Sequence, residues 1–572
     1  MHTKNYLQLF LLMSFAILSK ATEANSKSLF EQRIKEKDLK KVLMGALLYI
    51  DDSQIRERKG KGSPEYDACG VGDGCFPTPI GSPTIPMLFK ITRNLEGEWA
   101  NYINIYPERF PKPLSNQGMV QLQDSNMFMT AAVSYPLHLF DESLLDEQDK
   151  VISSILKLST KNLNNFFNEK GFTFWPKQKG TSSDAERVGP LNIPMFAGRG
   201  IEILKLIPFK EESQFTKEWL LDALDPNKNP YGVDALANIP ADADDTAVAL
   251  AHYQTFSAEK SPAELEVLAN SLLNFRDLDR SKEDGRDQWK EGQSGAFLTW
   301  LKDENLDRDH RFLNPELGIM PLGVNNVDCV VNANVLFALG LSNPGQEADE
   351  AIEASSKLML RAAAGKHWPG CGLYYPQKML FPYAISRAYR DGGIDNQYME
   401  QAMAILLSDL LAEQENTGAF SGGTDQSKDL STALAVVSLL NIGKDLADSL
   451  GLAKIYHDAI SKGIGYLVSN AKSQAIKHRD TFNRGQSFNL FPPFGRQSFS
   501  WESGLYFSAS NWDLAQWRSK AYTASMVVEA IAKYLLAYDQ GKAGQLGGKL
   551  KVRSYARSTR EATSKFQLGI DP

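Results

Sequence analysis

The chain has few cysteines and histidines for its length, and both shortages limit its chemistry. Of its 572 residues, four are cysteine and seven are histidine. The histidines are scattered, with no His-Glu-x-x-His cluster, and the cysteines lack the paired Cys-x-x-Cys spacing of a zinc site. We therefore expect no metal site built from cysteine or histidine.

Long apolar runs and an excess of positive charge are also missing. Beyond the N-terminus, apolar stretches such as 327–341 and 431–440 are interrupted by Asp, Asn, Ser or Gly, which suits buried helices and not a membrane span. The formal net charge of −7 at pH 7 gives no indication of nucleic-acid binding. Basic residues gather only in 541–572, which is Gly/Ser-rich and predicts a flexible C-terminal tail.

The N-terminus has the features of a secretory signal. Lys4 precedes an apolar core from Leu7 to Leu18, and the small-x-small triplet Ser19-Lys20-Ala21 follows. The core is short for a membrane span, although an uncleaved anchor helix is the alternative. We expect residues 1–21 to be removed near Ala21, leaving a periplasmic or secreted protein.

An exported chain with four cysteines predicts disulfide bonds. Cys69 and Cys75 bracket the Gly-rich loop 70–74, which indicates a small local disulfide. Cys329 and Cys371 then either pair with each other or stay buried as thiols.

Two helical patterns alternate from about residue 116 to 540, after a heterogeneous N-terminal helical and loop region (22–115). The first pattern is a short polar stretch followed by an apolar, Ala-rich helix. It begins at Asp124, Asp242, Asp328, Asp429 and Arg518, with a sixth example at Phe381. The second is charged and amphipathic, and it predicts helices over 148–168, 263–275, 347–362, 396–414 and 454–468.

Gly–aromatic turns recur with these helices, at 171–175, 295–297, 372–374 and 418–420. The unit of amphipathic helix, aromatic turn and apolar helix is an internal repeat. Six apolar helices inside six amphipathic ones would form an all-α (α/α)6 toroid. An open helical solenoid is the competing arrangement.

The stretch Pro240-Ala-Asp-Ala-Asp-Asp-Thr-Ala247 concentrates acidic residues at the start of an apolar helix. Asp242, Asp244 and Asp245 place three carboxylates within four positions. Because like charges repel, at least one should keep its proton and could serve as a general acid. Alternatively, one aspartate caps the helix and the others interact with its dipole.

Further residues are candidates for lining a binding site. Asn332 and Asn334 lie in an otherwise apolar helix, where they would line a cavity or link helices. Glu502 is expected in an apolar pocket that would raise its pKa. Arg518 would bind an anionic group at a helix N-terminus or lie as a solvated rim charge. Aromatic candidates near these residues are Trp501, Tyr506, Trp512 and Tyr522.

The motif Asp242-Ala-Asp-Asp-Thr-Ala247 resembles the Asp-x-Asp-Asp-Thr-Ala motif of class II terpene cyclases, typified by squalene–hopene cyclases. Gln414-Glu-Asn-Thr-Gly-Ala-Phe420 is similar to their Gln-x-x-x-Gly-x-Trp repeat, with Phe in place of Trp. The resemblance implies an α/α barrel in which Asp244 is the proton donor and Asp242 and Asp245 tune it.

The resemblance also implies the substrate class. Such enzymes protonate an alkene or epoxide of an isoprenoid, and aromatic faces stabilise the cation during cyclisation. It implies no cofactor, and an apolar substrate taken from a membrane. The sequence has no Asp-Asp-x-x-Asp motif for metal-dependent ionisation of a diphosphate.

Two other functions fit the same helical pattern. A periplasmic glycan-processing hydrolase or lyase would pair Asp244 with Glu502 or Asp328 and stack sugars on aromatic residues. A non-catalytic barrel would bind a lipid or peptide, and its aspartate cluster would be structural.

Overall fold

A computed structural model of the protein describes residues 36–56, 95–105, 120–139, 148–168, 171–179, 186–188, 239–256, 260–279, 293–302, 325–342, 347–366, 368, 371–423, 426–474, 497–508 and 515–538. Within these ranges the chain is mainly α-helical, as its sequence predicts. The predicted signal peptide, the loop with Cys69 and Cys75, Trp512 and the C-terminal tail all lie outside the described residues.

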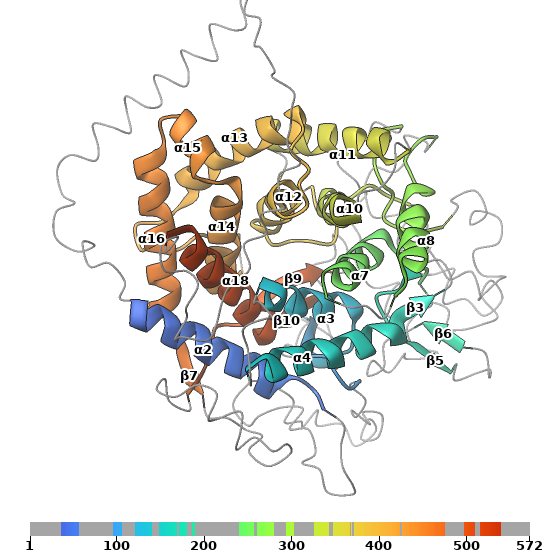
Figure 1. Ribbon diagram of the computed structural model, residues 1–572, viewed down its shortest axis with the longest axis horizontal. Coiled ribbons are helices and arrows are strands. Elements are labelled where there is room, and N and C mark those ends of the chain that lie inside the picture. The colour runs from blue at the N-terminus through green and yellow to red at the C-terminus, as the bar shows by residue number, and fades with distance from the viewer. Residues whose placement is uncertain are drawn as a thin grey trace, which may run out of the picture.

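The apolar helices predicted from the sequence are present and largely buried. They are α3 (Met127–Ser134), α7 (Ala243–Thr255), α10 (Cys329–Ser342), α12 (Leu380–Arg390), α14 (Lys428–Ile442) and α18 (Lys520–Tyr538). In this order each packs against the next, and α18 also packs against α3 (Figure 1). Small residues permit close approach, since a Cβ at Gly340 of α10 would collide with the backbone of Gly392.

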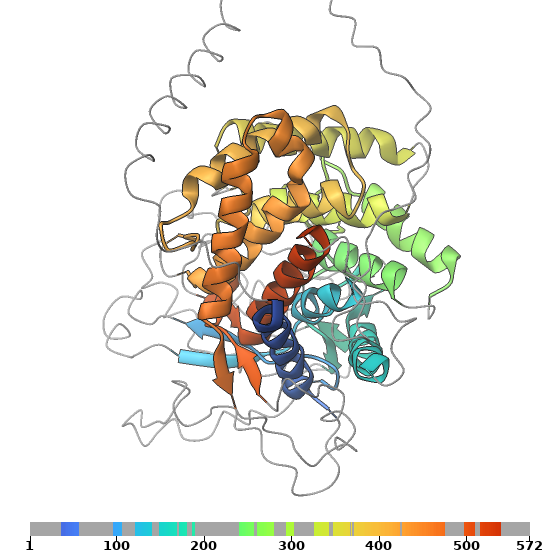
Figure 2. The same ribbon diagram turned by 60° about the vertical axis from the view of Figure 1, so that its left-hand side comes forward.

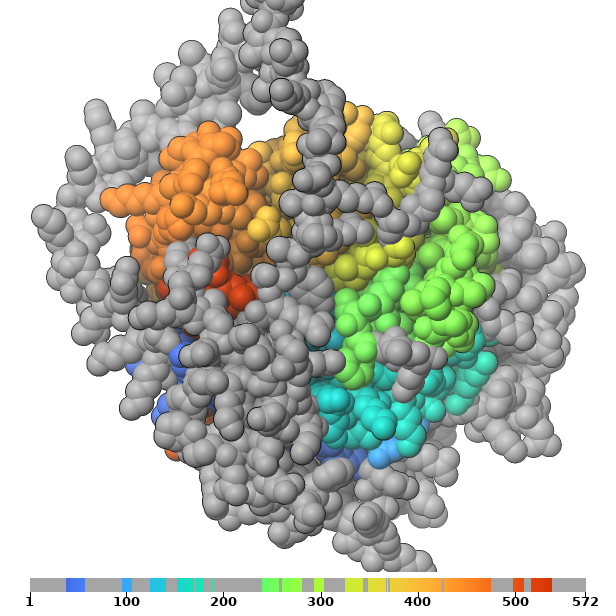
Figure 3. Space-filling view, viewed as in Figure 1, coloured from blue at the N-terminus to red at the C-terminus, as the bar shows by residue number. Residues whose placement is uncertain are grey.

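The amphipathic helices lie outside these, close to their predicted bounds. They are α4 (Gln148–Leu163), α8 (Pro262–Leu273), α11 (Glu347–Ala364), α13 (Gln397–Glu413) and α16 (Ala453–Ser469), with the short α15 (Lys444–Ser449) before α16. In the space-filling view, successive segments follow one another around the molecule in chain order (Figure 3). Each helix buries one face; α13 does so with Met399, Ala402, Met403, Leu406, Leu407 and Leu410.

Helix α2 (Glu36–Ser53) brings the N-terminal region against the end of the chain. It packs along α18 and also contacts α16 (Figure 2). Its apolar residues Leu43, Ala46 and Ile50 are fully buried in that contact region. The N-terminal region therefore contributes to the same hydrophobic core as the helical repeat.

A four-stranded antiparallel sheet was not predicted from the sequence. Its strand order is β2-β1-β10-β9, from β1 (Asn101–Ile105), β2 (Val120–Asp124), β9 (Gly504–Ser508) and β10 (Ala515–Ser519). Ile103 lies opposite Leu122 on one side and Trp517 on the other. Strands β2 and β10 lead into α3 and α18, so the sheet lies at the N-terminal ends of these helices.

Six shorter strands form hairpins or local pairs among the described residues. They are β3 (Phe167–Asn168) with β4 (Gly171–Phe172), β5 (Lys177–Lys179) with β6 (Glu186–Val188), and β7 (Lys472–Gln474) with β8 (Ser498–Ser500).

The Gly–aromatic turns are fixed by one recurring hydrogen bond to the apolar helix that follows. The amide of Phe172 donates to Thr246 Oγ1 at 2.9 Å, and the amide of Phe420 donates to Thr432 Oγ1 at 3.0 Å. In the α10 unit the amide of Phe297 donates to Asn332 Oδ1 at 2.9 Å. The repeat therefore has a polar lock between turn and helix in addition to its apolar packing.

Cys329 and Cys371 form a disulfide, one of the two outcomes that the sequence left open. Cys329 begins α10, and Cys371 immediately precedes the Gly372–Tyr374 turn. The bond therefore fixes this turn to the start of α10. Among the described helices, none is both long and apolar enough to cross a membrane.

Candidate active site

Asp242 is the N-cap of α7, which confirms the capping role considered for one aspartate of the motif. Its carboxylate accepts a hydrogen bond from the amide of Asp245 at 2.7 Å. Its backbone is held on both sides, because its amide donates to Phe172 O and the next amide, of Ala243, donates to Thr299 O. Asp244 and Asp245 occupy the first turn, where capping does not need them.

Asp244 is buried between three parts of the chain. Asn334 Nδ2, from α10, donates to Asp244 Oδ1 at 2.6 Å. The hydroxyl of Tyr375, from the turn before α12, contacts Asp244 Oδ2. The Cys329–Cys371 disulfide joins the segments that carry these two partners. The carboxyl group is thus enclosed by defined neighbours and shielded from water.

This environment favours the protonated form of Asp244. Burial raises the pKa of Asp244 well above its ordinary value, and the negative charges of Asp242 and Asp328 raise it further. The hydrogen bond from Asn334 and the positive charge of Arg387 act in the opposite direction. These effects favour the protonated form of Asp244 over the carboxylate, and the protonated form is the state a general acid requires.

The neighbouring aspartates are also affected. Burial raises the pKa of Asp245 well above its ordinary value, and the charge of Asp242 adds to the effect. Burial raises the pKa of Asp242 to about 6, against the lowering effect of its hydrogen bonds with Asp245. Asp242 is thus the member of the trio that ionises first, and its charge helps keep the proton on Asp244.

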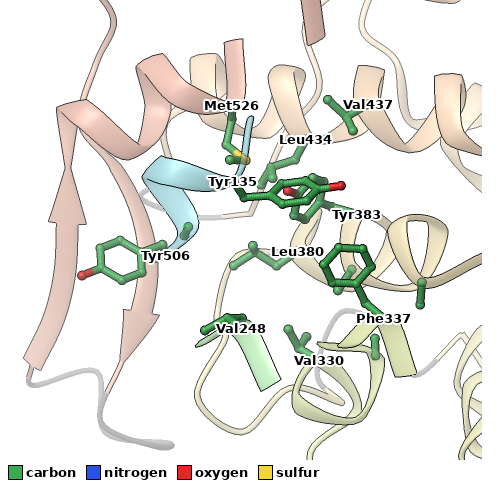
Figure 4. Packing of buried hydrophobic residues seen from close by; sticks show 14 of the residues in the cluster. Tyr135, Val248, Val330, Phe337, Leu380, Tyr383, Leu434, Val437, Tyr506 and Met526 are labelled. Atoms are coloured by element: carbon green, nitrogen blue, oxygen red, sulfur yellow. The ribbon is translucent and has the colours of Figure 1, made fainter. Parts of the chain in front are cut away.

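A cavity lies among the apolar helices beside this acid. Figure 4 shows how several of its lining side chains lie, among them Val248, Leu380 and Tyr383. Val248 and Ala251, which follow Asp244 on α7, form part of the cavity wall. Asn334 also lines the cavity and hydrogen-bonds to Asp244. The space open to the centre of a water molecule is about 20 Å³, which is enough for a water or two. The other lining side chains are mostly apolar or aromatic and include Phe128, Tyr135, Val330, Phe337, Leu380, Tyr383 and Tyr522.

A pair of histidines lines the other end of the cavity. His252 follows Asp244 by two turns of α7, about 12 Å along the helix axis. Thr160 Oγ1 donates to Leu156 O, so His252 Nε2 carries hydrogen and donates to Thr160 at 2.7 Å. His252 Nδ1 then accepts from His138 Nε2 at 3.4 Å. Burial lowers the pKa of His252 to about 3, so it remains a neutral imidazole.

A buried cation also lines the cavity. Arg387 of α12 donates from Nη2 to Asn334 Oδ1 at 2.6 Å. Its guanidinium group lies within 5.1 Å of the ring centroids of Tyr135, Phe337 and Tyr383. Asn334 therefore bridges Arg387 and Asp244.

The aspartates expected at the starts of other apolar helices have different roles. Asp328 caps α10, since its carboxylate accepts from the amides of Val330 and Val331. Asp124 is not a cap, because Asn126 caps α3. Asp429 is not a cap either, because Ser427 caps α14.

Asp124 instead holds aromatic side chains at the sheet. Its carboxylate accepts from the indole N–H groups of Trp175 and Trp517, the latter at 2.8 Å. Phe507 lies 5.0 Å from Trp517 and 4.9 Å from Phe174 between ring centroids. An aromatic cluster therefore covers the N-terminal end of the apolar helices.

The other predicted site residues divide between the cavity and its surroundings. Asn334 and Tyr522 line the cavity, whereas Asn332 binds the Phe297 turn through both its amide atoms. Trp501 is a core residue whose indole N–H donates to Leu467 O.

Three more predicted residues lie near the sheet. Tyr506 is fully buried and accepts from Asn126 Nδ2 at 3.2 Å. Arg518 is the penultimate residue of β10, two residues before α18, and is partly buried, with long contacts to Ser503 O and Gln516 Oε1. Glu502 is exposed, so the apolar pocket expected around it is wrong. Glu502 follows the buried Trp501 in a loop, where neither hydrophobic periodicity nor composition predicts which way a side chain points.

Sequence patterns missed Tyr375, Arg387 and the histidine pair. Arg387 is a lone charge in the apolar stretch Ala384–Ala388, which is a usable signal for a buried functional cation. His252 shares α7 with the aspartate motif, and its position two turns onward was a second available signal. No protein-family model matches the chain, and no curated protein matches it.

Proposed function

We propose that the protein is an exported, class II terpene cyclase-like enzyme that begins cyclisation of an isoprenoid by protonating it with Asp244. The observation that carries this proposal is the buried carboxyl group of Asp244, whose pKa is raised by burial, beside an aromatic-lined cavity. Such a group combines a proton to give with surroundings that exclude water from a carbocation.

The proposed architecture is the (α/α)6 toroid. In its support, α3, α7, α10, α12, α14 and α18 pack in sequence, and the last returns to the first. The amphipathic helices lie on their outer side, with α2 beside α18 as the remaining outer helix. An open solenoid would leave α3 and α18 without contact.

The proposed first step is a proton transfer from Asp244 to the substrate. The O–H bond of the acid breaks as a C–H bond forms on an alkene, or an O–H bond on an epoxide, and Asp244 becomes a carboxylate. Asn334 Nδ2 and the Tyr375 hydroxyl then stabilise the new charge as donors. The cation formed on the substrate is attacked by the next double bond, which closes a ring.

Aromatic rings near the acid would stabilise positive charge on the substrate. Phe128 lines the cavity and lies 5.7 Å from Tyr375 and 6.0 Å from Tyr506 between ring centroids. An isoprenoid is larger than the present space of about 20 Å³. Substrate binding therefore requires lining side chains to separate.

The decisive experiment compares the wild-type enzyme with Asp244→Asn on squalene and geranylgeraniol, with products identified by gas chromatography and mass spectrometry. We expect cyclic products from the wild type and a loss of about 10²- to 10⁴-fold in rate for the variant. Asp429→Asn is the matched control, because Asp429 lies in the first turn of another apolar helix and binds the amide of Glu502.

The outcomes separate the alternatives. Full turnover by Asp244→Asn would show that another group supplies the proton. If the wild type binds an isoprenoid and returns it unchanged, the protein is a binding barrel. Release of reducing sugar from envelope polysaccharide would favour the glycan-processing alternative.

A further inference from the structure

Among the described residues, Asn334 hydrogen-bonds to both the acid and a buried cation. Its Nδ2 lies 2.6 Å from Asp244 Oδ1, and its Oδ1 lies 2.6 Å from Arg387 Nη2. A guanidinium group has only donors, so only the amide oxygen can face it. With the oxygen committed to Arg387, the NH2 group must face Asp244.

Arg387 is itself held in place. Its guanidinium carbon lies 4.6 Å from the Phe337 ring centroid, 5.0 Å from Tyr135 and 5.1 Å from Tyr383. Nη1 also donates to the Tyr383 hydroxyl at 3.4 Å. An arginine remains charged in any surroundings, so it cannot reverse its hydrogen-bonding role.

The charges around Arg387 are balanced on its far side. Tyr383 donates to Glu529 Oε2 at 2.9 Å, and Lys533 lies 3.1 Å from Glu529 and 2.6 Å from Asp391. Two cations, Arg387 and Lys533, thus balance two carboxyl groups, Asp391 and Glu529. Arg387 therefore does not need a negative charge on Asp244 as its counterion. Tyr135 and Tyr522 are the other titratable groups that face the guanidinium group.

On the side of Asp244, the titratable groups that affect its charge are all acidic apart from Arg387. Asp242 and Asp245 come from α7, Asp328 from α10 and Tyr522 from α18. The neutral Asn334 amide therefore lies between two clusters: the acidic groups around Asp244, and the charge-balanced groups around Arg387. Its orientation decides whether Asp244 Oδ1 receives a donor or an acceptor.

We infer that Arg387 is a positioning residue for the general acid, acting through Asn334 to hold the acidic proton on Asp244 Oδ2, on the Tyr375 side. The inference rests on the proposed function. The NH2 group can only donate to Oδ1, whereas the Tyr375 hydroxyl beside Oδ2 can rotate to accept, so the proton belongs on Oδ2. The same donor then stabilises the carboxylate left after proton transfer.

Loss of Arg387 would free the amide to rotate. A rotated Asn334 would present its oxygen to Asp244 and accept a hydrogen bond from the acid. The proton would then lie on Oδ1 and be held between two protein groups. The acid would still be neutral, but a fraction of molecules would have its proton in the wrong place.

The test measures the carbonyl stretch of protonated Asp244 directly, by infrared difference spectra against Asp244→Asn, without any substrate. We expect one band in the wild type and a shifted or split band in Arg387→Met. Asn334→Ala should shift the band as well. The double variant Asn334→Ala/Arg387→Met should match Asn334→Ala alone, because Arg387 acts through the amide.

The control is Lys357→Met, which removes a cation paired with Glu353 without touching Asn334 or Arg387. It should leave the wild-type band in position. If Arg387→Met does not fold, Arg387→Gln keeps a polar side chain and should give two bands, because a Gln amide can face either way.

Two results would overturn the inference: an unchanged band in the folded Arg387 variant, or an equal further shift when Arg387→Met is added to Asn334→Ala. In turnover, Arg387→Met should lower kcat about 10- to 100-fold with little change in KM. Because the infrared measurement needs no substrate, the positioning role can hold even if no isoprenoid is converted.

Discussion

Buried acidic groups occur at two ends of the apolar helices, and their surroundings differ. At the N-terminal ends of α7 and α10, Asp242, Asp244 and Asp328 lie close together, with their nearest cation beyond an amide. Near the C-terminal ends of α12 and α18, Lys533 lies directly between Asp391 and Glu529. The first arrangement retains protons and the second neutralises charge with charge. In the second, burial also raises the pKa of Glu529, but the charge of Lys533 opposes that shift.

The largest expected effect on stability comes from removing the cation of the second cluster. Lys533→Met leaves Asp391 and Glu529 buried without their counterion, which should lower the free energy of unfolding by about 3–5 kcal/mol. Denaturant unfolding measures this change. Lys357→Met removes an exposed cation paired with Glu353 and should leave the free energy of unfolding almost unchanged. Equal losses in the two variants would contradict the role of burial.

The disulfide is expected to matter next, because it joins both partners of the acid. The double variant Cys329→Ser/Cys371→Ser opens a link across a sequence separation of 42 and should lose about 2–4 kcal/mol. It should also lower activity by loosening Asn334 and Tyr375 around Asp244. Thermal unfolding with and without a reducing agent gives the test. A wild type insensitive to full, verified reduction would exclude this contribution.

The acidic cluster predicts a stability that falls as pH rises. Burial raises the pKa of Asp328 from 3.8 to about 6, so its contribution is complete below pH 3.8 and is lost as pH passes 6. Asp328→Asn keeps a capping side chain without that titration. Its stability relative to wild type should therefore increase between pH 4 and pH 7, by at most about 3 kcal/mol. A constant difference across this range would refute the assignment.

The polar lock of the aromatic turns should give the smallest effect, because it involves neutral groups. Thr432→Val keeps the shape of the side chain but leaves the Phe420 amide without its acceptor. We expect a loss of about 1–2 kcal/mol that does not depend on salt. Thr417→Val, at an exposed position of the same turn, is the control. If Thr432→Val lost as much stability as Lys533→Met, a neutral hydrogen bond would matter as much as a buried counterion, which would contradict this ranking.

Local sequence patterns predicted the helices well. Helix α13 was expected over 396–414 and runs from Gln397 to Glu413, because its apolar residues repeat at the helical period. The sheet was missed because β1 and β10 pair residues more than 400 positions apart, such as Ile103 and Trp517. No local period records such a pairing.

The acid itself was predictable, but its surroundings were not. Three aspartates in four positions pointed to Asp244, and an amide in an apolar helix pointed to Asn334. Tyr375 and Arg387 were missed because their places depend on how α12 and its preceding turn pack against α10 and α7. Packing between distant segments decides which polar side chains meet, and the sequence alone does not specify it.

The contact between α2 and α18 has a consequence for the order of folding. Ribosomes complete α2 long before α18, yet α2 buries its apolar face on that last helix. The apolar face of α2 therefore stays uncovered until nearly the whole described chain has been made. Contacts so distant in sequence form slowly, and their unfinished surfaces attract other chains. This protein should depend on chaperones during synthesis more than a helical protein closed by neighbouring segments.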